Sequence, residues 1–261
     1  MNAINSKTGR ENKIKELEQE YKGMSDVLKS SIYLNQHVSS LAMLDAVQSV
    51  QYMSNLGAEE YYLGSAGVGE GFSVGEHTET ALRVFEESFE KEMPKELSSF
   101  TKYVILMHDI GKSKRREFGG QKAANESICS QFSKKLGIDA KAEELVLFVI
   151  SESQEYTSGY YIYGKQDSLY QLEKRCKEVL ADYIGRDPTK EEVRGLMKVC
   201  EILQTCDTAA YSLCSVTRDV KRNVCYYNGN EDFTQSLNYC GFGHPRISLK
   251  VSDSDKKANK R

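Results

Sequence analysis

Two histidines and two aspartates stand at positions where each could bind a metal ion. An apolar run ends in the adjacent pair His108–Asp109 and then turns at Gly111. His77 opens a second amphipathic segment, and Asp207 ends a third. Neutral imidazole and carboxylate are both ligands for divalent ions of borderline or hard character. These residue types therefore point to a metal site, provided that the fold brings them together.

Hydrophobic spacing predicts that each of these residues lies on the inward side of a separate helix. Asp207 shares the apolar face of its segment, where a carboxylate is costly unless it is paired or bound to a metal. Apolar residues recur at offsets of three and four in all three segments: Ala81, Val84, Phe85 and Phe89; Leu97, Phe100, Val104 and Met107; and Val193, Met197, Cys200 and Leu203.

The rest of the chain also favours helices, so the expected fold class is all-α. Gly23 is expected to end a short helix over 11–22, and further helices are expected over 26–56, 121–136 and 168–184. Asp139 is expected to cap one more helix, and Thr189 with Glu192 marks the start of the helix that carries Asp207.

The four residues and their flanks resemble the HD-domain superfamily of metal-dependent phosphohydrolases. The local sequence EHTETALRVF is similar to the first-histidine helix of that family, and LMHDIGK is similar to its central motif. The resemblance covers roughly residues 70–215. It implies an HD-like helical bundle of about five core helices. It also implies a centre in which His77, His108, Asp109 and Asp207 bind a divalent metal.

The chain departs from the two-metal members of that family. Gln121, Ser153 and Gln154 stand near the places where those members carry further histidines, and none is a good replacement ligand. One metal ion is therefore expected. Its identity among Mn, Fe, Co, Ni, Zn and Mg does not follow from mixed nitrogen and oxygen ligands. The function expected from the resemblance is hydrolysis of a nucleotide phosphoester by a metal-activated water. A cyclic (di)nucleotide phosphodiesterase and a catalytically silent HD-fold module that binds a nucleotide or a protein are the alternatives.

Basic residues that follow the central motif are the candidates for holding phosphate. Lys112, Arg115 and Arg116 are expected to bind substrate, and Lys112 is preferred because the family motif places it beside the metal. The alternative for Lys112 is an exposed lysine at a helix end. Asp109 and Lys112 are also expected to take part in catalysis. Glu126 is a further candidate for proton transfer, although glutamates on helix faces are usually solvated.

Composition limits the cellular setting and the partners. The 261-residue chain has a formal net charge of −3 and seven cysteines. This balance gives no global field that attracts nucleic acid, which is not expected as a partner. No apolar run is long enough to span a bilayer, and the scattered, odd cysteine count indicates a reduced, cytoplasmic protein. The expected partner is a small phosphorylated substrate, and a homodimer is permitted.

Three parts are expected along the chain. Residues 1–63 would form an N-terminal helical extension that packs on the core, and residues 64–216 would form the HD-like core. Residues 217–261 would form an irregular or β-hairpin appendage with a basic tail. The segment 64–75 holds five glycines but lacks the Gly-Lys-Ser/Thr that a P-loop needs, which favours a connection or a lid.

Overall fold

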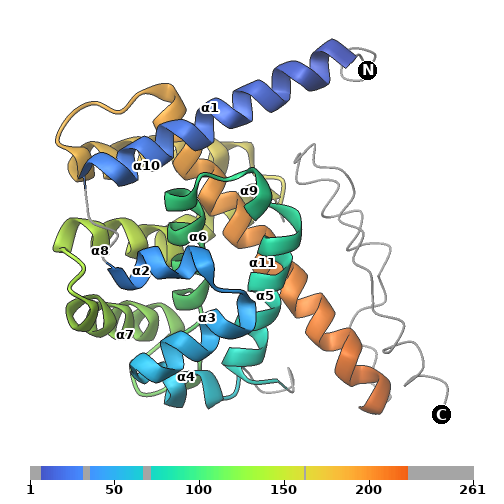
Figure 1. The fold of residues 1–261 in the computed structure, drawn as a ribbon. Helices are drawn as coiled ribbons and strands as arrows, with labels where there is room; N and C mark the ends of the chain where they lie inside the picture. Colours follow the sequence, from blue (N-terminus) through green and yellow to red (C-terminus); the bar gives the residue numbers. More distant parts are fainter. Residues whose placement is uncertain (1–6, 32–35, 67–71, 162, 223–261) are drawn as a thin grey trace.

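A computed structural model describes residues 7–31, 36–66, 72–161 and 163–222 (Figure 1). Regular structure in this part of the chain is helical, apart from one isolated antiparallel bridge between Ser65 and Ser73. The all-α expectation is therefore confirmed. The expected C-terminal hairpin falls on residues 223–261, and the centre of the glycine-rich segment falls on 67–71. Both lie outside the described residues.

The α-helices follow one another with short connections. They are α1 (Lys7–Ser31), α2 (Gln36–Ser40), α3 (Ala46–Met53), α4 (Glu59–Leu63), α5 (Val74–Ser88), α6 (Lys95–Met107), α7 (Gln121–Leu136), α8 (Ala140–Leu147), α9 (Ser153–Tyr161), α10 (Gln166–Ile184) and α11 (Lys190–Arg222). Single turns of 3-10 helix lie at Leu41–Met43, Glu90–Glu92 and Lys112–Lys114, and π turns lie at Ser54–Ala58 and Phe148–Glu152.

Local caps fix where the site-bearing helices begin. Ser73 and Glu76 form a reciprocal capping box that starts α5 just before His77. Thr189 and Glu192 form the equivalent pair at the start of α11, as the sequence predicts. The predicted cap at Asp139 is also confirmed, because its carboxylate accepts from the backbone N–H groups of residues 141 and 142.

Helix α6 lies at the centre of the bundle and delivers the His108–Asp109 pair from the interior (Figure 1). Every residue from 97 to 112 is buried, so this helix has no solvated face. Helices α1, α2, α5 and α11 all contact it. Its buried Lys102 is paired with Glu86 and Glu90, as a charge in a core element must be. The His108–Asp109 pair is therefore held by the most enclosed segment of the described fold.

Helix α1 packs along the first part of α11, and two glycines permit their close approach (Figure 1). A Cβ at Gly195 would lie 2.5 Å from the Glu20 carbonyl oxygen, and one at Gly23 would lie 3.2 Å from the Glu191 Cβ. The predicted helix break at Gly23 is wrong, because α1 continues through it to Ser31. Gly23 lies in the contact between the two helices, and the packing of α1 against α11 offsets its poor helix propensity.

Helix α11 is also longer than expected. The expectation that Asp207 ends its helix is wrong, because α11 continues beyond it to Arg222, past the expected boundary between residues 216 and 217. At its start it contacts α1, and further along it contacts α5. The N-terminal residues 21, 24, 27 and 28 belong to the same hydrophobic cluster as the core helices. The three-part division of the chain stays a prediction.

Candidate metal centre

Four side chains from three parts of the fold converge at one point. His77 comes from α5, His108 and Asp109 come from the turn that ends α6, and Asp207 comes from α11. One ligand atom from each lies within 4.8 Å of all the others. The first three residues are buried, whereas the side chain of Asp207 keeps 19% of its surface exposed. The sequence therefore predicted the members of this cluster correctly.

The distances within the cluster suit a small divalent ion. His77 Nε2 lies 2.8 Å from Asp207 Oδ1, and His108 Nε2 lies 3.4 Å from the same oxygen. Asp109 Oδ2 lies 3.5 Å from His77 Nε2 and 3.7 Å from His108 Nε2. Ligands about 2.1 Å from a metal stand roughly 3–4 Å from one another. Three of these four distances lie in this range, and the fourth, between His77 Nε2 and Asp207 Oδ1, is a hydrogen-bond distance.

The imidazole of His108 is oriented as a ligand. Its Nδ1 lies 2.6 Å from the Ile105 carbonyl oxygen, so Nδ1–H donates there, and in the neutral ring Nε2 carries the lone pair that a metal would bind. Nε2 is buried, faces the two carboxylates and makes no hydrogen bond among the described residues. Metal-bound histidines usually donate their other ring N–H to a carbonyl or carboxylate in this way. The residues present therefore fit a bound metal.

Electrostatics at the cluster favour positive charge. Burial lowers the pKa of His108, but the carboxylates of Asp109 and Asp207 and the Ile105 carbonyl outweigh it and raise the pKa to about 9. Burial raises the pKa of Asp207, but His108 and His77 outweigh it and hold the pKa well below its usual range. A site that retains a proton between two carboxylates also attracts a divalent cation in its place.

An aromatic ring that the sequence did not single out covers one side of the centre. Phe72 stacks on His77 with ring centroids 5.7 Å apart and an interplanar angle of 12°. The rings of His77 and His108 lie 5.5 Å apart at 42°. Phe72 is buried, so it shields His77 from water on that face. In the sequence, Phe72 is a single aromatic residue after a glycine-rich segment, and nothing in that pattern indicates that it stacks on a histidine.

Helix α7 braces the turn that carries the His108–Asp109 pair. Asn125 Oδ1 accepts from the Gly111 backbone N–H at 2.8 Å, and Asn125 Nδ2 donates to the His108 carbonyl oxygen. A Cβ at Gly111 would lie 2.5 Å from the Ala124 carbonyl carbon, so only glycine allows this approach. Gly111 has a φ of −88°, and its small size rather than a left-handed conformation explains its place in the motif.

Two side chains outside the four proposed ligands also contact the carboxylate of Asp109. Lys112 Nζ lies 3.2 Å from Asp109 Oδ2, and Gln121 Nε2 donates to Asp109 Oδ1 at 2.7 Å. Lys112 is only 4% exposed, so the alternative of an exposed lysine at a helix end is wrong, and its expected contact with phosphate stays a prediction. Gln121 reaches the centre as a hydrogen-bond donor to a proposed ligand. Ser153, by contrast, donates to the Val149 carbonyl oxygen within its own helix.

The two arginines that were expected to bind substrate follow Lys112 along the chain. Arg115 is partly exposed and Arg116 is exposed, and both follow the 3-10 turn that begins at Lys112. In the described part of the chain neither belongs to the four-residue cluster, and their expected role in substrate binding stays a prediction.

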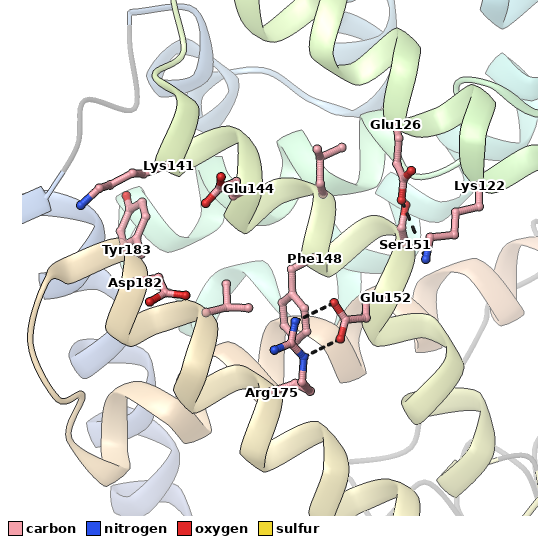
Figure 2. Close-up of a pocket in the computed structure, with 12 residues that line it drawn as sticks. Lys122, Glu126, Lys141, Glu144, Phe148, Ser151, Glu152, Arg175, Asp182 and Tyr183 are labelled. Atoms are coloured by element: carbon pink, nitrogen blue, oxygen red, sulfur yellow. Dashed lines mark hydrogen bonds and ion pairs between the residues drawn. The ribbon is translucent and has the colours of Figure 1, made fainter.

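Glu126 lines a separate groove between α7, α8, the π turn Phe148–Glu152 and α10 (Figure 2). The groove has a volume of about 290 Å³, and none of the four proposed ligands lines it. Glu126 pairs there with Lys122 at 3.9 Å, and Arg175 pairs with Glu152 at 2.6 Å across the groove (Figure 2). The expected role of Glu126 in proton transfer stays a prediction.

Comparison of the chain with known protein families, with curated proteins and with solved structures gives no match. The cluster is compatible with an HD-type metal site, and this rests on its residues and geometry. Among the described residues, no helix combines the length and the apolar character that crossing a membrane requires.

Proposed function

We propose that this protein is a metal-dependent phosphohydrolase that cleaves a phosphoester bond of a nucleotide. The observation that supports the proposal is the buried convergence of two imidazoles and two carboxylates from three helical segments. Such groups are expensive to bury together, and clusters of this kind are concentrated at functional sites. The proposed centre holds one divalent ion on His77, His108, Asp109 and Asp207.

The protein groups would hold and shape the centre. A bound divalent ion supplies Lewis acidity toward a phosphoryl oxygen and lowers the pKa of water. The Ile105 carbonyl keeps His108 Nε2 turned toward the centre. Of the four ligands, Asp207 is the most exposed, so the substrate would approach from the side of α11. Phe72 excludes water behind His77.

Basic residues after the motif would bind the substrate in this proposal. The ammonium group of Lys112 offsets the charge of Asp109 in the structure. If the Lys112 ammonium group also contacted a phosphate of the substrate, it would lie between that phosphate and Asp109 Oδ2. The more exposed Arg115 and Arg116 would add positive charge for a nucleotide's phosphates, because guanidinium pairs well with phosphate oxygens.

A catalytically silent module that binds a nucleotide or a protein is the second candidate. One observation favours it: Lys112, the preferred phosphate ligand, is buried against Asp109. This candidate predicts metal or nucleotide binding without hydrolysis.

The test is metal content and product analysis on His108→Ala. The purified protein would be loaded in turn with Mn²⁺, Co²⁺, Ni²⁺ and Mg²⁺ and incubated with a nucleotide panel. Wild type should bind about one ion per chain and hydrolyse one nucleotide class, and the variant should lose both properties. His37→Ala is the matched control, because His37 bonds Tyr52 elsewhere in the fold. Unchanged turnover in His108→Ala would refute the proposal, and metal binding without turnover would select the silent module.

A further inference from the structure

The two carboxylate oxygens of Asp109 have different neighbours. Oδ2 faces the centre, 3.5 Å from His77 Nε2 and 3.7 Å from His108 Nε2. The Lys112 ammonium group also lies 3.2 Å from Oδ2, whereas Oδ1 accepts the hydrogen bond from Gln121 Nε2 at 2.7 Å. A carboxylate can bind an ion through one oxygen or through both. Because Oδ1 is already engaged in a hydrogen bond, this centre favours binding through one oxygen.

Gln121 is held firmly enough to select one mode. It is the first residue of α7, and Asn125 one turn later fixes that helix to the backbone of the same motif. The close approach at Gly111 leaves little room for α7 to shift. The donor of Gln121 and the carboxylate of Asp109 are therefore attached to two segments whose separation is fixed.

We infer that Gln121 is a positioning residue for the metal centre: it occupies Asp109 Oδ1 and presents Oδ2 as the single oxygen that binds the ion. This inference rests on the proposed metal centre. Hydrogen bonds to a ligating carboxylate orient it, and losing such a bond typically weakens metal binding 10–100-fold. Without the donor, the contact of Lys112 with Oδ2 remains, but Oδ1 loses its restraint, and the terminal torsion of an aspartate has broad minima.

The test is titration calorimetry of the full-length, metal-free protein with Mn²⁺ at 25 °C. Gln121→Met keeps most of the side-chain volume and removes the donor, and Gln121→Ala removes both. Each should bind Mn²⁺ about 10–100-fold more weakly than wild type. Lys122→Ala is the matched control, because Lys122 is the next residue on α7 and its side chain is 68% exposed. This control should bind Mn²⁺ as wild type does.

A purely structural role for Gln121 would lower the melting temperature and leave the dissociation constant unchanged while each variant is folded. Circular dichroism at 25 °C would confirm that condition. If Gln121→Met retains wild-type affinity, the hydrogen bond does not position Asp109 and the inference is wrong, although the proposed function stands. If wild type binds none of Mn²⁺, Co²⁺, Ni²⁺ and Mg²⁺ in the same titration, both the inference and the proposed function fail.

Discussion

Asn125→Ala should destabilise the whole protein, because Asn125 satisfies two buried backbone groups at once. The substitution leaves the Gly111 N–H and the His108 carbonyl without their side-chain partner. Both residues are buried in the core. Each unsatisfied buried group costs about 1–3 kcal/mol, so the loss for two groups should be near 3 kcal/mol or more. In a chain of this size, that corresponds to a fall in melting temperature of about 6–12 °C.

Urea unfolding of the metal-free protein, followed by circular dichroism, measures this loss directly. Gln131→Ala is the matched control, because it removes an exposed amide from the same helix. That control should stay within about 0.5 kcal/mol of wild type. An Asn125→Ala protein as stable as the control would show that the two bonds do not hold the turn. The account of how α7 braces the His108–Asp109 pair would then be wrong.

Two further outcomes follow from the cluster and from the helix crossing. Because the pKa of His108 is raised to about 9, its contribution to the stability of the metal-free protein is fully present below about pH 6.5 and is lost as the pH rises through 9. Urea unfolding in the presence of chelator should show that the free energy of unfolding falls by up to about 3 kcal/mol from pH 6.5 to pH 9.5. The His108→Gln variant should not show this fall. If the same pH dependence persists in His108→Gln, His108 is not its cause. At the crossing, Gly195→Ala should destabilise the fold by about 1–3 kcal/mol, because its Cβ would overlap the Glu20 carbonyl. Gly23→Ala should be nearly neutral, since its looser contacts are offset by better helix propensity; unfolding experiments that reverse this order would refute the packing argument.

Local signals predicted some helices well, but the helix expected over 26–56 is wrong, because this segment holds the end of α1, α2, a 3-10 turn and α3, with extended backbone at Leu44. The segment expected over 121–136 is α7 with the same bounds, and the caps at Asp139 and Thr189 form as expected. Periodicity placed the ligands on inward faces because the apolar residues around them obey the same spacing. Caps and periodicity depend on residues within one or two turns, so the sequence carries them directly.

Contacts between distant segments were not predictable in the same way. The sequence identified Gln121 only as a position without a histidine, and gave no reason to expect its bond to Asp109. Asn125 resembles any other polar residue on a helix until α6 and α7 are brought together. Gly23 was expected to end a helix, because its propensity is visible in the sequence and the neighbouring α11 is not. Tertiary packing decides all three positions.

The hydrogen bond between His77 and Asp207 joins residues 130 positions apart, and this separation constrains when the centre can form. A chain made from its N-terminus holds three of the four ligands long before α11 leaves the ribosome. Until then the His108–Asp109 pair has no Asp207 beside it, and α11 does not yet pack against α5 and α6. Metal loading should therefore be one of the last events in the maturation of this protein, after synthesis of nearly all of the described fold.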